Sequence, residues 1–143
     1  MVRDGLLNFH FCLFDLEGSY KGGFYHGVLE LHENYPFMAP KLIFFTPNGR
    51  FETNIPICTS FTNFHQESWT SAWNVRTLIL ATISFMYSEE PSYGCKTETD
   101  ENRKDYAKNS LTHNKGNDQF INLFGAKLVE IGIIADVDMK KSS

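Results

Sequence analysis

The organisation of this chain depends on residues 44–73, which read FFTPNGRFETNIPICTSFTNFHQESWTSAW. The apolar residues of this stretch follow neither the period of a strand nor the period of a helix. The stretch is nevertheless rich in Phe and Trp, which predicts an ordered loop attached to a core, and long ordered loops often carry function. Cys58 lies near its middle. This thiol is either a nucleophile or a small buried apolar residue.

Three segments before this stretch have the pattern of strands. They are residues 6–16 (LLNFHFCLFDL), residues 24–32 (FYHGVLELH) and residues 41–45 (KLIFF). The first two alternate with period two and carry apolar residues on both faces, and the third is a short apolar run. Because the connections between them are short, we expect an antiparallel meander.

The period changes to that of a helix after residue 73. Asn74 is a good N-cap for a helix with an apolar face made of Val75, Leu78, Ile79, Ile83 and Met86. Residues 100–114 predict a surface helix with a thin apolar stripe of Tyr106, Ala107 and Leu111. A last helix is expected from Asn117, with helical spacing of Phe120, Leu123, Phe124, Leu128 and Ile131. Strands followed by helices predict one α+β domain over residues 1–143, with the meander packed on a central helix.

Composition excludes several classes of function. With 13 Lys and Arg against 17 Asp and Glu, the chain has no electrostatic footprint for nucleic acid. Its 3 cysteines are odd in number and far apart, which indicates a reducing compartment and no disulfide framework. The sequence has no CxxC pair, so a structural zinc site is not expected. No run approaches the roughly 20 apolar residues of a membrane helix, and no signal peptide opens the chain. We expect a soluble, cytoplasmic protein without metal or cofactor.

The three cysteines differ in their surroundings. Cys12 lies inside a strand pattern and is expected to serve packing. Cys95 lies in a polar loop, with no neighbour that would activate it. The sequence around Cys58 lacks the His and Asp pattern of a cysteine hydrolase, so position alone leaves its role open.

An ordered set of motifs is more specific than any one of these features. It comprises YPFMAPKLIFFTPNGRF (35–51), ICTSF (57–61) and WTSAWNVRTLI (69–79). Together they resemble the centre of a ubiquitin-conjugating enzyme, over about residues 5–114, and are most similar to the tail-anchored branch of that family in endoplasmic-reticulum-associated degradation. Thr46 stands where the family has His. Residues 1–6 are too short for the amphipathic helix that opens the family fold, and the branch's membrane tail is absent from this sequence.

The resemblance implies a nucleophile, an oxyanion donor and a residue that assists the acceptor. Cys58 would accept ubiquitin as a thioester from an activating enzyme and pass it to a substrate lysine, or a hydroxyl, with a RING-type ligase. Asn48 would donate a hydrogen bond to the oxyanion of the transfer step, the alternative being that Asn48-Gly49 only forms a turn. His65 would act as a base or orient the acceptor, and a loop-bracing histidine is the more common alternative.

The resemblance also implies partner surfaces. Phe37, Ser71 and Ala72 occupy the positions of the ligase-docking loops, and Ser71 replaces the proline that is usual there. A location on the cytosolic face of the endoplasmic reticulum is expected if an anchor accompanies this domain. The competing hypothesis is a catalytically inactive relative that serves as a ubiquitin-binding or scaffold module. The missing first helix favours that alternative, whereas the intact sequence around Cys58 argues against it.

Overall fold

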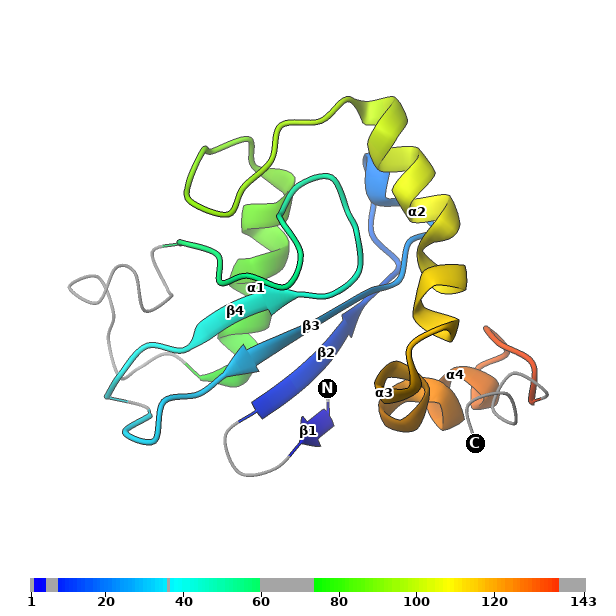
Figure 1. The fold of residues 1–143 in the computed structure, drawn as a ribbon, viewed down its shortest axis with the longest axis horizontal. Coiled ribbons are helices and arrows are strands. Elements are labelled where there is room, and N and C mark those ends of the chain that lie inside the picture. The colour runs from blue at the N-terminus through cyan, green and yellow to red at the C-terminus, as the bar shows by residue number, and fades with distance from the viewer. Residues whose placement is uncertain (1, 5–7, 36, 60–73, 137–143) are drawn as a thin grey trace.

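The structure is a computed structural model that describes residues 2–4, 8–35, 37–59 and 74–136 (Figure 1). One antiparallel sheet holds four strands in the order β1-β2-β3-β4. Their bounds are Val2–Asp4, Asn8–Leu13, Tyr25–Glu30 and Lys41–Phe44. The three predicted strands and their meander are confirmed. The first edge strand was not predicted, because three residues are too few for a readable period; it pairs with β2 through the register Val2↔His10.

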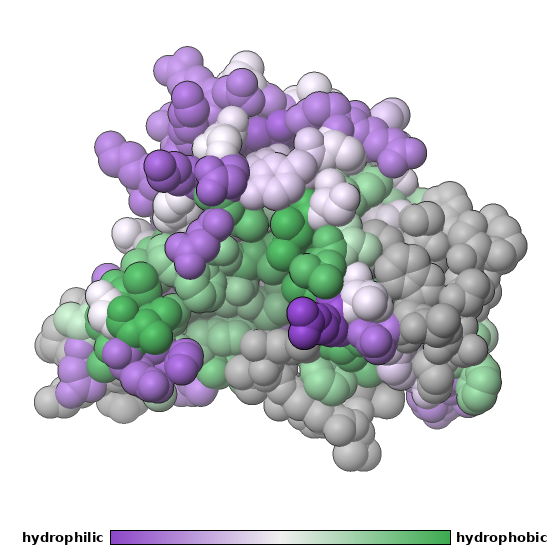
Figure 2. Space-filling view, turned by 180° about the vertical axis from the view of Figure 1, so that it is seen from behind, coloured by the Kyte–Doolittle hydropathy of each residue, from purple (hydrophilic) through white to green (hydrophobic). Residues whose placement is uncertain are grey.

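The central helix α1 (Val75–Tyr87) lies across one face of the sheet (Figure 1). Asn74 caps it as predicted: Thr77 N donates to Asn74 Oδ1 at 2.9 Å, and Asn74 N donates to Thr77 Oγ1 at 2.9 Å. Its fully buried residues are spaced four apart, at Leu78, Thr82 and Met86. The opposite side of α1 faces solvent, where apolar residues gather in the middle of the surface (Figure 2) and Leu80 is 55% exposed.

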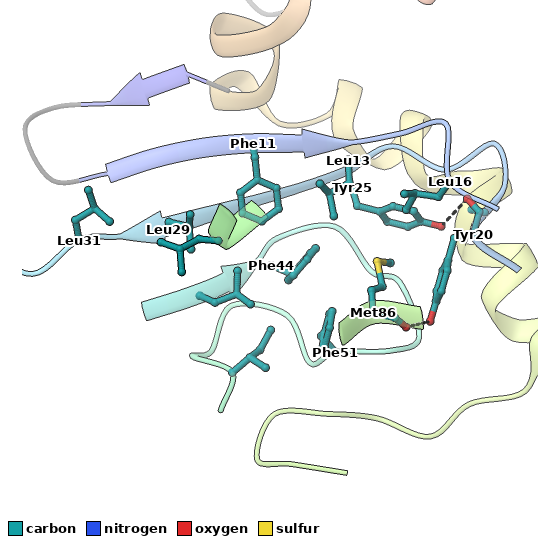
Figure 3. Packing of buried hydrophobic residues seen from close by; sticks show 14 of the residues in the cluster. Phe11, Leu13, Leu16, Tyr20, Tyr25, Leu29, Leu31, Phe44, Phe51 and Met86 are labelled. Carbon is teal, nitrogen blue, oxygen red and sulfur yellow. Dashed lines mark hydrogen bonds between the residues drawn. The ribbon is translucent and has the colours of Figure 1, made fainter. Parts of the chain in front are cut away.

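The main core lies between the sheet and α1 (Figure 3). Odd-numbered residues of β2 and β3 point into it, including Phe11, Leu13, Tyr25 and Leu29. The loop after β4 contributes Phe51, whose ring stacks on Phe44 with the centroids 4.9 Å apart. This ring attaches the loop to the core, as the aromatic content of the stretch predicted.

A second cluster covers the other face of the sheet. The predicted last helix is divided into α3 (Asp118–Phe120), the π-helical turn η3 (Ile121–Gly125) and α4 (Ala126–Glu130). The buried residues of this second cluster are Phe120, Ile121, Phe124, Leu128 and Ile134. The predicted helical segment from Asn117 is confirmed, whereas the place of Ile131 on its apolar face was wrong. The wider turn shifts the helical register, and the chain leaves the helix at Ile131, which is 43% exposed.

Even-numbered residues of β2 and β3 meet this second cluster. Nδ1 of His10 lies 2.8 Å from Nε2 of His26, and both rings are buried. Rings of Phe120 and Phe124 lie 5.7 and 5.5 Å from the ring of His26. Cys12 packs on the same cluster, which confirms its predicted packing role, and burial raises the pKa of its thiol to about 12.

The helix α2 (Asp100–Lys115) departs from the predicted stripe. Tyr106 and Leu111 are only partly buried. The buried face is mostly polar and consists of Arg103, Ala107, Ser110 and Asn114. These polar groups are tolerated because they bond to the loops beside the helix, as the next subsection describes. In the part of the chain that the structure describes, no helix has the length and apolar character to cross a membrane.

Candidate active site

The loop that leads to Cys58 begins at a buried threonine. Thr46 Oγ1 donates to Asn114 Oδ1 at 2.6 Å and accepts from the backbone N–H of His26 at 2.9 Å. One hydroxyl therefore joins β3, the loop and α2. The substitution of threonine for the family's histidine leaves a residue with a structural role at this position.

The side chain of Asn48 is 1% exposed and bonds to the backbone of its own loop. Its Oδ1 accepts from Arg50 N at 2.9 Å and from Phe51 N at 2.7 Å, and its Nδ2 donates to Thr46 O at 2.9 Å. Gly49 has φ +79°, so the turn that the Asn-Gly pair predicted is present. An amide nitrogen carries two hydrogens, and the bond to Thr46 uses one of them.

Cys58 lies in a shielded position at the end of the described loop, with 9% of its surface exposed. Its backbone N–H donates to Tyr93 O at 2.9 Å. The preceding residue, Ile57, is fully buried and its N–H donates to Leu42 O in β4 at 2.9 Å. Cys58 is thus held between the edge of the sheet and the segment around Tyr93.

Cys95 belongs to that same segment and is half-buried. It pairs with Phe51 in an isolated antiparallel bridge and packs against the main core. Burial is the main cause that raises the pKa of the Cys95 thiol. A thiol in this state is a weak nucleophile. Among the described residues, none of the three cysteines takes part in a disulfide.

We call residues 88–96 the 88–96 loop. Its acidic residue Glu89 accepts from Arg103 Nη1 at 2.7 Å, and this hydrogen bond is the main cause that lowers the pKa of the Glu89 carboxyl. Tyr93 is 64% exposed, directly beside Cys58. Tyr93 contributes the backbone carbonyl that accepts the Cys58 N–H, whereas the carboxylate of Glu89 is paired with Arg103.

Of the remaining predicted site residues, Phe37 is the one that lies among the described residues. Phe37 is 75% exposed, on the connection between β3 and β4, as expected of an accessible aromatic residue. His65, Ser71 and Ala72 lie outside the described residues. Their predicted roles stay predictions.

Sequence reasoning missed two buried arginines, Arg50 and Arg103, which are 1% and 4% exposed. Arg103 Nε donates to Gly49 O at 3.1 Å, and Arg50 donates to the end of α1 and to the 88–96 loop. The available signal was weak: Arg50 is a single cation inside an aromatic run, and Arg103 shares a helix face with Ala107 and Ser110.

The arrangement has features that acyl transfer through a thioester requires. One shielded thiol lies at the end of a loop whose backbone is hydrogen-bonded to β4 at Ile57 and to Tyr93 at Cys58. Protein thiols accept acyl groups and release them readily to amines, because a thiolate is a good leaving group.

Comparison with known families agrees with this chemistry. The model of the family described as "Ubiquitin-conjugating enzyme" matches residues 1–117. In fold, the chain is similar to the crystal structure of a putative ubiquitin conjugating enzyme from Plasmodium yoelii, with a TM-score of 0.55 at 17% identity over 78% of this chain and 77% of that one.

Curated relatives are similar over most of this sequence. Mouse ubiquitin-conjugating enzyme E2 J2 is 36% identical over 131 residues, which are 91% of this chain and 51% of that protein. Ubiquitin-conjugating enzyme E2 6 of Schizosaccharomyces pombe is 36% identical over 125 residues, 86% of this chain and 55% of that protein. The chain therefore spans about half the length of these relatives.

Proposed function

The chain belongs to the ubiquitin-conjugating enzyme family, in the branch of its E2 J2 and E2 6 relatives, and we propose that Cys58 carries ubiquitin as a thioester. The observation that supports this most is the placement of Cys58. It is a shielded thiol held through its own backbone by the 88–96 loop, whereas Cys12 packs on the C-terminal cluster and Cys95 packs on the main core.

The proposed reaction has two acyl transfers. The Cys58 thiolate attacks the thioester carbonyl that joins ubiquitin's C-terminal glycine to the activating enzyme, and the activating enzyme's thiolate leaves. An acceptor amine then attacks the Cys58 thioester, the Cys58 thiolate leaves, and the proton of the amine passes to solvent or a base. The product is ubiquitin joined to a substrate lysine by an amide bond.

Asn48 has two compatible parts in this proposal. Its Oδ1 braces the loop through the N–H groups of Arg50 and Phe51. Its Nδ2 is the proposed donor to the oxyanion that develops on the thioester carbonyl. His65 is proposed to orient a lysine or hydroxyl acceptor, on the family resemblance alone.

The partners follow from the two transfers. We propose ubiquitin, an activating enzyme, a RING-type ligase and a protein substrate. Phe37 supports a ligase contact because an exposed aromatic side chain is a favourable interface anchor, with Ser71 and Ala72 beside it in the family's docking surface. The 3 free cysteines fit a reducing compartment, and we place the protein in the cytoplasm, at the cytosolic face of the endoplasmic reticulum where an anchor is present.

The proposal is tested by a loading assay. The protein is mixed with activating enzyme, ATP and ubiquitin, and the products are separated on gels with and without reductant. We expect a band heavier by one ubiquitin that reductant removes, and its loss in Cys58→Ser, where any adduct is a reductant-resistant ester.

Cys95→Ser is the matched control, because it replaces a neighbouring thiol by the same residue. It should load as the wild type does. A labile band in Cys58→Ser that disappears in Cys95→Ser would move the site to Cys95. No labile band from the wild-type chain would support the inactive binding or scaffold module instead.

A further inference from the structure

Arg50 is a buried cation whose side chain reaches the beginning of the 88–96 loop. Its Nη2 donates to Glu90 O at 2.8 Å, to Phe85 O at 3.3 Å and to Ser88 Oγ at 3.4 Å. These acceptors lie in the last turn of α1 and in the residues that follow it. A single guanidinium therefore ties the loop to the helix from which it departs.

The surroundings explain how a charge is accommodated there. The guanidinium carbon lies 4.8 Å from the ring centroid of Phe85 and 5.2 Å from that of Phe51. The carbonyl end of a helix carries partial negative charge, and α1 has no basic residue in its own last turn. Arg50 supplies that cation from another part of the chain. Among the described residues it pairs with no carboxylate, so carbonyls, a hydroxyl, the Cys95 thiol and rings define its place.

The backbone of Arg50 holds the other end of the same loop. Its carbonyl accepts from Lys96 N at 2.8 Å, and its own N–H donates to Asn48 Oδ1. The side chain thus fixes the loop where it begins, and the backbone fixes it where it ends. Arg103 adds a parallel link, from Gly49 O to the carboxylate of Glu89.

The loop so held is in direct contact with the residues around Cys58. The carbonyl of Tyr93 accepts the N–H of Cys58. A Cβ at Gly94 would lie 3.1 Å from Pro56 O and 3.2 Å from the Cα of Ile57, so the two backbones pass each other with no room for a side chain. A displacement of the loop would therefore move Cys58 or open a gap beside it.

We propose that Arg50 is a positioning residue for ubiquitin transfer, acting on Cys58 through the 88–96 loop. This inference rests on the proposed function. Arg50 touches neither ubiquitin nor the acceptor in this scheme. It fixes the wall along which the acceptor amine approaches the thioester, and small displacements in such a wall slow the chemical step.

The test measures single-turnover discharge of the loaded 143-residue chain to free lysine over a range of lysine concentrations. Arg50→Met keeps the apolar stem and removes the donors, and we expect its maximal discharge rate to fall about tenfold with loading unchanged. Arg50→Lys keeps one donor and should recover to within about threefold of the wild type. Leu128→Ala, in the cluster on the other face of the sheet, controls for lost stability and should discharge as the wild type does.

Amide hydrogen exchange distinguishes a local effect on Cys58 from a general loosening of the fold. If Arg50→Met does not fold, the exchange is measured in Arg50→Lys. The amide of Cys58 bonds to the loop, whereas the amide of Ile57 bonds to β4. We expect faster exchange at Cys58 and unchanged exchange at Ile57. Wild-type discharge by the Arg50 variants, or equal acceleration at both amides, would overturn the inference. Failure of the wild-type chain to load would instead refute the proposed function itself.

Discussion

On the α1 side of the sheet, buried polar side chains hold the loop of Cys58, whereas apolar contacts hold the C-terminal segment on the other side. Asn48 bonds to backbone groups of its own loop, and Arg50 bonds to the carbonyls of Phe85 and Glu90 and to Ser88 Oγ, all within 3.5 Å. Phe124 and Leu128 instead meet their neighbours through rings and aliphatic side chains. The buried pair of His10 and His26 is the polar exception on that side.

The exact position of a side chain matters more near Cys58 than in the C-terminal cluster. A hydrogen bond to a backbone group fixes both distance and direction, whereas an apolar contact tolerates small shifts as long as the volume is filled. Substitutions near Cys58 should therefore change the rate of transfer, and substitutions in the C-terminal cluster should change stability while the transfer rate of the folded protein stays the same.

The largest loss of stability is expected from Leu128→Ala. Leu128 is 3% exposed in the C-terminal cluster, and removing its side chain leaves a cavity that lowers the free energy of unfolding by about 3 kcal/mol. Denaturant titration measures this loss. Discharge of ubiquitin to lysine, measured well below the melting temperature, should match the wild type. A slower discharge would show that the C-terminal cluster affects the transfer rate as well as stability.

Asn48→Ala should affect both quantities. The backbone N–H groups of Arg50 and Phe51 lose their acceptor, which lowers the free energy of unfolding by about 2–3 kcal/mol. Discharge to lysine should slow by about tenfold while loading persists.

Asn48→Asp separates the two roles of Asn48, because it keeps the acceptor oxygen and lacks the donor. We expect it to discharge slowly as well; discharge at the wild-type rate would leave Asn48 with the bracing role alone.

Acidification should weaken the C-terminal side through His26. Burial, followed by the proximity of His10, lowers the pKa of His26 from 6.5 to about 4. The unfolded chain then binds the proton more strongly, so this contribution is fully present above pH 6.5 and is lost as the pH falls toward 4. The free energy of unfolding should drop by about 2 kcal/mol between about pH 7 and pH 5.

His26→Phe checks the origin of this drop. The ring of His26 already lies among Phe45, Phe120 and Phe124, so an aromatic replacement retains much of the packing. Denaturant titrations at the two pH values should then agree much more closely. The same fall of stability in His26→Phe would assign the pH dependence to other groups.

The smallest effect is expected from Glu89→Gln. The carboxylate of Glu89 is 63% exposed, so its ion pair with Arg103 is screened by solvent and contributes below about 1 kcal/mol. Thermal melts at low and high salt should show a small loss that salt reduces. Glu130→Gln is a matched control, because its pair with Lys127 is exposed on both sides and its removal should leave the melt unchanged. Equal losses of melting temperature in the two variants would show that the ion pair of Glu89 with Arg103 contributes no more to stability than a fully exposed pair.

The sequence predicted those parts of the fold in which one period is sustained. The strands around Phe11 and Leu29 and the capped helix after Asn74 were found in this way. The π-helical turn was not, because Phe120, Phe124 and Leu128 keep helical spacing whether or not one turn widens.

The site was predictable only in part, for a different reason. The motif around Cys58 drew attention to the thiol, and Asn48-Gly49 indicated the turn. Arg50 was missed because most of its partners are carbonyls, which every residue has and no sequence pattern marks. In an aperiodic stretch, burial of a cation is decided by tertiary contacts that lie 35 to 40 residues further along the chain.

The central claim, that Cys58 is the ubiquitin carrier, is tested most directly by mapping the thioester in the wild-type chain. Trypsin separates the three cysteines into residues 4–21, 51–76 and 77–96. After loading and brief digestion at mildly acidic pH without reductant, mass spectrometry should find the C-terminal remnant of ubiquitin on the peptide 51–76, which holds Cys58. The remnant on the peptide of Cys12 or Cys95, or on none of the three, would contradict the account.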